Sequence, residues 1–556
     1  MKRRFRLFAG LVSFGMLAAA CGGTGATTSQ SPGATVKEGG VFRVGSTSTI
    51  DSLNPFVAFN SDSYTAFMYI YPYLVMYAAG DPTKFAGDLA TSWSVSADGK
   101  DWTFTLRPGA TWSDGQPLDS SDAAFTFNTY LKYEKGPASY YAGIIAHLQS
   151  VDAPDPTTFV MHYDVPVANV IYQMQQAPIL PPQTWASYAT GDGKGLKTFA
   201  NNPPPVSGGP FELKNYVKGQ SAVFTRNPNW YGEKPHIDEW GFRFYSNDDA
   251  EVTGLKNGEI DAIETAPPTQ VTSLKAAGFT IDELPGVEFK DFIFNSNPSK
   301  PNNKELLDPQ VRLAIAHAID RNRIVQTSYL GYAKPADSII SPASGIWHDP
   351  SLHPETFDLA LANQLLDQAG YAKGPDGIRT ANGHPMTYQV IFPQSESGTG
   401  DRTFQIIQSD LQQIGIKITQ RTLDDSAAFD AILAPNNKYL TYDLSMWDWI
   451  PYVADPDFIL SVLTCAQYGG WSDSAYCNPQ YDQLYKQQAV TVDQQQRVKI
   501  VYQMEEMISN ARPYIAIVYP DVLEAVAKNW TGFVPDAGAG SFSSDSKFSL
   551  IRIHQR

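Results

Sequence analysis

The three cysteines are the side chains whose positions suggest covalent chemistry. Cys21 follows Leu17-Ala18-Ala19-Ala20, a pattern typical of a lipobox, where a cysteine sulfur is acylated and the chain is cut just before it. Lipoboxes usually place leucine three residues before the cysteine, where this chain has Ala18. The alternative interpretation is an ordinary secretory signal followed by an incidental cysteine. We expect lipidation at Cys21.

The other two cysteines, Cys465 and Cys477, are twelve residues apart in a stretch rich in Gly, Ser and Tyr. An exported chain meets an oxidising compartment, so we expect them to form a disulfide. Closing so short a loop stabilises the fold by about 3 kcal/mol. Two free thiols or a metal pair are the alternatives, although no histidine lies between the two cysteines.

The sequence otherwise lacks the motifs of catalysis. It contains no Walker loop, no dinucleotide-type glycine fingerprint, no H-E-x-x-H pair and no G-x-S-x-G elbow. Acidic pairs such as Asp424-Asp425 and Asp248-Asp249 arise by chance in a chain with 57 acidic residues. A glycosidase dyad stays open, because its two carboxylates need not be close in sequence. We expect no catalytic residue, no cofactor and no metal site, and a protein that is not an enzyme.

The first forty residues predict export and tethering. Residues 1–20 read as a signal peptide: a basic start is followed by an apolar stretch, Leu7 to Ala20, that is too short to span a bilayer. Residues 21–40 hold no aromatic side chain and almost no large apolar one, so they predict a flexible tether. We therefore expect a protein that is lipid-anchored to the cell membrane and faces away from the cytoplasm, at the cell surface or in a periplasm.

The composition excludes several classes of partner. Without the four basic residues of the predicted signal, 57 acidic residues face 37 basic ones, which argues against nucleic-acid binding. The remaining chain is too long for one hydrophobic core and predicts two or three lobes. No later apolar run approaches twenty residues, so we expect no further membrane span.

Strand and helix patterns alternate along the chain. Residues 93–106 predict a hairpin that turns at Asp98-Gly99. Asp308-Pro309 predicts the start of a helix, and apolar periodicity predicts two more over 362–369 and 404–414, each closed by a glycine. A strand is expected from Ile416. This alternation predicts an α/β fold.

Five sequence motifs occur in order along almost the whole mature chain. They are LATSWSVSADG with WTFTLRPGATWSDGQPL (89–118), GGPFEL with RNPNWYG (208–213 and 226–232), VRLAIAHAIDR (311–321), LLDQAGY (365–371) and CNPQYD (477–482). Taken singly they shape turns and helices, and the double glycine predicts a close backbone approach. Together they resemble the extracellular solute-binding proteins, family 5, of ABC importers, the oligopeptide- and dipeptide-binding group.

The resemblance implies a large two-lobed clamshell of the type II periplasmic-binding-protein kind, with an inserted extra subdomain. Lobe I would comprise 41–80, 206–286 and 519–556, with the subdomain at 81–205, and lobe II would be 287–518. Two strands would cross between the lobes, near residues 286–287 and 518–519. Such a protein captures a small solute, most often a peptide, and delivers it as a monomer to the permease subunits of an ABC transporter.

The resemblance also places candidate ligand contacts in the stretch from Tyr442 to Asp457. Trp447 and Trp449 would point the same way on a strand, as core residues or as an aromatic wall of the cleft. Peptide-binding relatives carry an aspartate for the peptide's amino terminus at the position of Tyr452, and a phenol cannot replace a carboxylate there. Asp448 or Asp455 could supply the charge. Tyr64 and Asn295 lie in segments that lead toward the cleft in the family.

The Tyr452 difference leaves other ligands open. The family also includes receptors for nickel complexes, oligosaccharides and other solutes. A sensor or adhesin that reports ligand to a partner protein, and a secreted hydrolase, are alternatives from other classes.

Overall fold

The structure is a computed structural model, and it describes residues 36–433, 442–451, 455–536, 538, 540–542 and 547–556. The chain divides into two compact units, Met1–Val36 and Lys37–Arg556. Cys21, the predicted signal peptide and the predicted tether up to residue 35 lie outside the described residues, and so does Tyr452.

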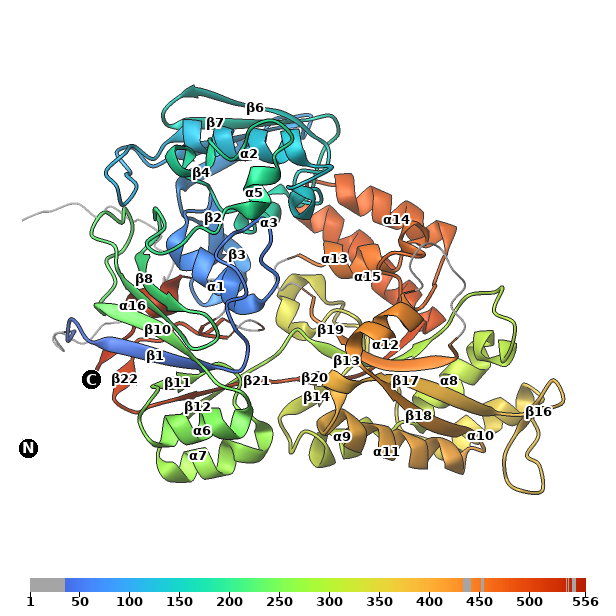
Figure 1. The fold of residues 1–556 in the computed structure, drawn as a ribbon. Helices are drawn as coiled ribbons and strands as arrows, with labels where there is room; N and C mark the ends of the chain where they lie inside the picture. The colour runs from blue at the N-terminus through green and yellow to red at the C-terminus, as the bar shows by residue number, and fades with distance from the viewer. Residues whose placement is uncertain (1–35, 434–441, 452–454, 537, 539, 543–546) are drawn as a thin grey trace, which may run out of the picture. The chain divides into compact units, whose positions relative to one another are not determined.

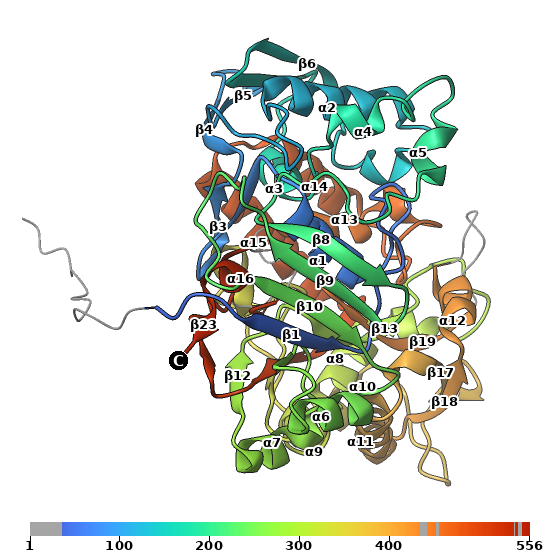
Figure 2. The same ribbon diagram turned by 60° about the vertical axis from the view of Figure 1, so that its left-hand side comes forward.

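The first lobe is built on a seven-stranded mixed sheet that gathers strands from distant parts of the chain (Figures 1 and 2). Its order is β12 (Thr280–Leu284), β21 (Val522–Val526), β11 (Ala262–Ile263), β1 (Val41–Ser46), β10 (Glu239–Phe244), β9 (Ser221–Arg226) and β8 (Phe211–Val217). The helices of this lobe are α1 (Ser61–Ile70), α6 (Asp248–Lys256), α7 (Val271–Ala277) and α16 (Phe548–Arg552).

A four-stranded antiparallel sheet forms a separate layer within the segment 81–205. Its order is β4 (Ala90–Val95), β5 (Asp101–Leu106), β7 (Thr158–Tyr163) and β6 (Leu148–Asp155). The predicted hairpin is confirmed as β4 and β5, and Gly99 takes the left-handed φ of 76° that its turn requires. The helices beside it are α2 (Ser120–Tyr133), α3 (Val170–Gln175), α4 (Pro182–Trp185) and α5 (Lys194–Thr198).

The second lobe has its own six-stranded sheet. Its order is β14 (Ala333–Pro335), β20 (Tyr514–Pro520), β13 (Phe289–Phe294), β19 (Leu444–Trp449), β17 (Thr387–Pro393) and β18 (Lys417–Leu423). Its helices are α8 (Pro309–Ala318), α9 (Arg321–Thr327), α10 (Leu359–Gln368), α11 (Thr399–Gln413), α12 (Asp425–Ile432), α13 (Asp457–Val462), α14 (Pro479–Val490) and α15 (Gln494–Ala511). The fold is therefore two-lobed α/β, as predicted.

The three helices predicted from periodicity are α8, α10 and α11. The Asp308 carboxylate accepts a hydrogen bond from the Gln310 amide at 2.9 Å and caps α8, whose first residue is proline. Gly370 and Gly415 follow α10 and α11 with φ of 88° and 82°, the left-handed conformation that ends a helix. The strand expected from Ile416 is β18.

The chain passes between the two large sheets twice, through the crossing segments 285–288 and 520–522. The first joins β12 to β13, and the second joins β20 to β21. The two segments touch, because a Cβ on Gly286 would lie 2.1 Å from the Pro520 carbonyl oxygen. The double glycine also makes its predicted close approach: a Cβ on Gly209 would lie 2.2 Å from the Tyr69 carbonyl oxygen. Only glycine fits at either place.

Separate hydrophobic cores hold the lobes. One joins the first large sheet to the four-stranded sheet and contains Phe42, Trp112 and Trp240. Two others cover opposite faces of the second large sheet, one around Phe292 and Phe294 and one around Phe289 and Ile293. Alternate residues of β13 thus serve different cores, as the pleat of a strand requires.

The remaining elements are short. They are β2 (Val75–Ala78), β3 (Asp81–Gly87), β15 (Thr380–Ala381), β16 (His384–Pro385), β22 (Trp530–Thr531), β23 (His554–Gln555) and the 3-10 helices Ser139–Tyr141, Pro268–Gln270, Lys304–Leu307, Pro342–Trp347, Gln394–Glu396 and Cys465–Gln467. In the described part of the chain, none of the helices combines the length and the apolar character that crossing a membrane requires.

Candidate functional site

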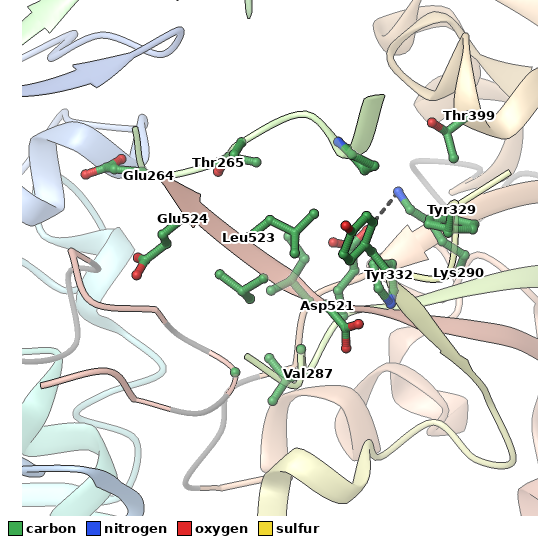
Figure 3. Close-up of a pocket in the computed structure, with 18 of the residues that line it drawn as sticks. Glu264, Thr265, Val287, Lys290, Tyr329, Tyr332, Thr399, Asp521, Leu523 and Glu524 are labelled. Carbon is green, nitrogen blue, oxygen red and sulfur yellow. Dashed lines mark ion pairs between the residues drawn. The ribbon is translucent and has the colours of Figure 1, made fainter. Parts of the chain in front are cut away.

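A cavity of about 630 Å³ lies at the crossing segments, between the two large sheets (Figure 3). This volume is in the range of pockets that hold small ligands. Both lobes contribute to its walls. The described lining residues are Ser61, Glu264, Thr265, Ala266, Pro268, Gly286, Val287, Glu288, Lys290, Tyr329, Tyr332, Ser395, Glu396, Ser397, Thr399, Gly400, Ile450, Pro520, Asp521, Val522, Leu523, Glu524, Gly538 and Phe542.

At one end of the cavity, Lys290 of β13 lies among three carboxylates. Its Nζ is 2.8 Å from Glu288, 2.9 Å from Glu396 and 3.5 Å from Asp448. Burial opposes the charge of Lys290, but the three carboxylates outweigh it and hold the lysine's pKa well above its ordinary value. Burial raises the pKa of Asp448 to about 6 despite the lysine. This end thus carries its own cation.

The opposite end is acidic, and among the described residues that line it none is a lysine or an arginine. Glu264 follows β11, and Glu524 lies in the neighbouring strand β21. Figure 3 shows both glutamates on the side of the cavity away from Lys290. Burial, and then the charges of Asp62 and Glu524, raise the pKa of Glu264 well above its ordinary value. Burial raises the pKa of Glu524 to about 8.

Apolar and aromatic side chains form the wall between these ends. Val287 comes from the first crossing segment and Leu523 from β21, just after the second, and Tyr329 and Tyr332 come from the chain between α9 and β14. Figure 3 shows Leu523 between the glutamates and the tyrosines. The cavity therefore suits a molecule with both apolar and charged parts, which is what a peptide offers.

Trp447 and Trp449 do point the same way from β19, into the core that contains Phe289 and Ile293. Trp449 is 7% exposed, and its Nε1 donates a hydrogen bond to Asp473 at 3.0 Å. Trp447 is half-buried and packs edge-on against Phe429. Neither tryptophan is among the residues that line the cavity. For Trp449 this is the core-packing role that the sequence left open.

Asp455 has an internal partner. Its carboxylate forms a two-pronged ion pair with Arg497, one contact being 2.7 Å from Nη2, and both side chains are buried. The Arg497 guanidinium also lies over the Trp347 ring at 4.9 Å. A bidentate pair of this kind occupies the oxygens that a ligand's ammonium would need.

Tyr64 and Asn295 also make contacts within the chain. The Tyr64 hydroxyl donates to the Ala58 carbonyl at 2.9 Å, and its ring stacks on Tyr140. Asn295 is fully buried and donates to the Tyr442 carbonyl at 2.8 Å. Neither lines the cavity as described. Asp448, another of the candidate ligand residues, contacts the cavity-lining side chain of Lys290.

The predicted disulfide between Cys465 and Cys477 is present in the structure. The loop that it closes carries Asp473, which accepts hydrogen bonds from Trp449 and from the hydroxyl of Tyr514. Burial raises the pKa of Asp473 to about 7. The disulfide therefore restrains the loop whose Asp473 accepts the hydrogen bond from Trp449.

Comparison with protein families identifies the family of this chain. Residues 84–470 match the model of the bacterial extracellular solute-binding proteins, family 5, in its middle region. The chain belongs to this family. The match covers most of the chain, including the four-stranded sheet, the first crossing segment and the second lobe up to residue 470, and it ends before α14, α15 and β20.

Relatives of this family-5 protein agree along most of its length. It is 25% identical over 500 residues to the probable D,D-dipeptide-binding periplasmic protein DdpA of Escherichia coli K12, covering 88% of this chain and 90% of the other. Its fold matches NikA of Brucella suis in complex with Fe(III)-EDTA, with a TM-score of 0.80, 20% identity and coverage of 93% and 100%. It also matches the oligopeptide-binding protein AppA of Bacillus subtilis in complex with a nonapeptide, with a TM-score of 0.73, 20% identity and coverage of 94% and 100%.

Sequence reasoning missed the charged residues of the cavity. Lys290, Glu264 and Glu524 were not among the candidates, although Lys290 and Glu524 leave a visible signal. Lys290 and Asp291 interrupt the apolar strand FKDFIF, and Glu524 interrupts VLEAV. A charge inside a strand that is otherwise apolar is rarely buried without a partner. That rule points to both residues once their strands are known, but neither β13 nor β21 of this family-5 chain was predicted from its residue pattern.

Proposed function

We propose that this protein is the solute receptor of an ABC importer and that its solute is a peptide. The observation that carries the proposal is the cavity at the crossing segments, because a ligand there contacts both lobes at once. Such a ligand favours the arrangement in which the lobes enclose it, and a permease can recognise that arrangement. Family membership and the dipeptide named for the Escherichia coli relative support the choice of solute.

The proposal includes a place and partners. The protein acts as a monomer outside the cytoplasm, is held to the membrane by a lipid on Cys21, and passes its ligand to permease subunits without changing it. The acidic composition supports a role without nucleic acid.

Ligand binding is tested on the purified chain that starts after the predicted tether. Small molecules that copurify with it are identified by mass spectrometry, and thermal unfolding is then followed with di-, tri- and tetrapeptides and with oligosaccharides. A ligand that binds the native state alone must raise the melting temperature. We expect peptides to do so. A shift with oligosaccharides and none with peptides would contradict the choice of solute.

The cavity itself is tested by filling it. Ser397 is exposed on the cavity wall, two residues before α11, so Ser397→Trp should abolish the peptide-induced shift. Ser351 is an exposed serine in a loop that does not line the cavity, and Ser351→Trp serves as the matched control. Equal peptide binding by both variants would place the ligand elsewhere.

The absence of a reaction is tested by recovery of the ligand. A bound peptide should be released intact after prolonged incubation with the protein, as judged by chromatography and mass. Cleavage that increases with protein concentration would instead identify a hydrolase.

The anchor is tested in the full chain expressed in a bacterium that processes lipoproteins. Cys21→Ser should move the protein from the membrane fraction to the soluble fraction. An unchanged distribution would favour the ordinary secretory signal.

A further inference from the structure

Glu264 and Glu524 occupy opposing positions on neighbouring strands. β11 and β21 pair antiparallel, with Ala262 opposite Val526 and Ile263 opposite Ala525. The same register places the residue after Ile263, which is Glu264, opposite Glu524. Side chains at opposed positions of an antiparallel pair are close neighbours, and like charges there destabilise the sheet. The two carboxylates thus face the same space from adjacent backbones, and both line the cavity.

These carboxylates retain unused hydrogen-bonding capacity. Glu524 is 2% exposed, and one of its oxygens accepts from the Ser541 amide at 2.6 Å, while Oε2 makes no hydrogen bond and has no contact with solvent. Oε1 of Glu264 is in the same condition, and so is Oδ2 of the buried Asp62 nearby. Burial and the charges of three other carboxyl groups raise the pKa of Glu264. No cation is among the described groups that shift this pKa.

At two other places the chain pairs buried or half-buried carboxylates with a cation of its own. Asp455 has Arg497, and Glu288, Glu396 and Asp448 share Lys290. Asp291 is the counterexample, because it is fully buried away from the cavity and neither of its oxygens makes a hydrogen bond. A buried carboxylate without a partner is costly. Glu264 and Glu524 differ from Asp291 in lining a cavity, from which a partner can arrive from outside the chain.

The cavity beside the two glutamates also limits what that partner can be. Its volume of about 630 Å³ far exceeds the space of a single ion. Leu523 and Val287 line the approach to the glutamates with apolar surface (Figure 3). A cation on an apolar stem would bury its stem against these side chains and bring its charge to the carboxylates.

We propose that Glu264 and Glu524 bind a cationic group of the ligand, an ammonium or a guanidinium carried on an apolar stem. The inference rests on the proposed function and assigns the positive charge of the peptide to this end of the cavity. That group comes either from a lysine or arginine side chain or from the amino terminus of the peptide.

The test uses four tetrapeptides and isothermal titration of the purified chain. They are Ala-Lys-Ala-Ala, its norleucine analogue Ala-Nle-Ala-Ala, and the N-acetylated form of each. Norleucine keeps the apolar stem of lysine and removes the ammonium. The wild type should bind the lysine peptide at least about tenfold more tightly than the norleucine peptide, as expected for a buried charge-assisted hydrogen bond. If acetylation causes that loss instead, the cation is the amino terminus.

Three variants test whether the preference for the lysine peptide over the norleucine peptide depends on Glu264 and Glu524. Glu264→Gln and Glu524→Gln keep the size of each side chain and should reduce the preference to about one. Glu283→Gln is the control: Glu283 lies in β12, one strand from β21, and is exposed and paired with Lys275. It should keep the preference. Thermal melts establish that all three variants are folded.

The outcomes separate this inference from the proposed function. If acetylated Ala-Nle-Ala-Ala binds the wild type as tightly as the lysine peptide, the inference is wrong and the receptor proposal stands. If no peptide binds, the receptor proposal fails and the inference falls with it. If CaCl₂ or MgCl₂ raises the melting temperature of the wild type but not of Glu524→Gln, the carboxylates serve a metal ion and the inference is wrong.

Discussion

Both ends of the cavity contain carboxyl side chains, but these differ in whether the described chain gives them a cation as partner. Around Lys290, three carboxylates share a cation that the chain provides. Glu264 is half-buried and Glu524 is buried, each has one carboxyl oxygen without a hydrogen bond, and the charges that act on Glu264 come, among the described residues, from other acids. The difference teaches that burial alone does not reveal a binding group. The informative feature is a buried charge whose partner the fold has left out.

Removing the internal cation should have the largest effect. Lys290→Met leaves Glu288, Glu396 and Asp448 without a counter-charge in a partly buried site, which we expect to lower the free energy of unfolding by about 3 kcal/mol. Urea denaturation measures the change. Lys218→Met, at an exposed turn, is the control and should leave the stability within about 0.5 kcal/mol of the wild type. A Lys290 variant as stable as this control would remove the distinction between the two ends.

Neutralising the other end should act in the opposite direction. Glu264→Gln combined with Glu524→Gln removes two opposed acidic groups, so we expect the ligand-free protein to gain about 2 kcal/mol at pH 8. The comparison is made by urea denaturation at one pH and salt concentration. Destabilisation of the double variant would mean that a partner for these groups already exists in the chain.

The pH dependence of stability should follow from the same groups. The folded-state pKa of Glu524 is raised to about 8, and burial also raises that of Glu251 to about 8 and that of Asp62 to about 6. Between the ordinary carboxyl value and these values, the folded state holds protons that the unfolded state has released. The free energy of unfolding should therefore fall as pH rises from about 5 to about 8, by at most about 1.4 kcal/mol per pH unit for each group.

The slope is measured by chemical denaturation across that pH range. It should be shallower for the Glu264→Gln, Glu524→Gln protein than for the wild type. Parallel slopes would show that other acids, including Glu288 and Asp448 at the Lys290 end, cause the pH dependence.

The smallest effect is expected for Asp448→Asn. Lys290 keeps Glu288 and Glu396 at shorter distances, and the Asp448 contact is the longest of the three at 3.5 Å. The change in the free energy of unfolding should be about 1 kcal/mol or less. A loss as large as that of Lys290→Met would show that Asp448 is the main partner of the lysine, and the same titrations would then test it as a ligand contact.

The local structure was largely visible in the sequence, because it depends on neighbouring residues. The Asp98-Gly99 turn, the Asp308 cap and the glycines after α10 and α11 act over three or four positions. The family motifs then supplied the two-lobed fold. The division into segments at 81, 206, 287 and 519 remains our proposal, with the observed change of sheet falling between Pro520 and Val522 in the second crossing.

The cavity could not be read in the same way, because its walls meet only in the folded protein. Glu264 and Glu524 are 260 residues apart and become neighbours through one two-residue strand. The candidates chosen from the stretch around Trp449 were plausible by family position. Of these, Asp455 turned out to have Arg497 as a partner from a helix forty-two residues further on. Pairings over such separations depend on the whole topology.

The position of β21 has a consequence for how the protein is made. This strand follows every strand of the second sheet in the chain, yet it lies between β12 and β11 inside the first sheet. A growing chain that stops before residue 522 leaves both neighbours with exposed edges, which invite wrong pairing. The first sheet can therefore be completed only after all strands of the second sheet have been synthesised.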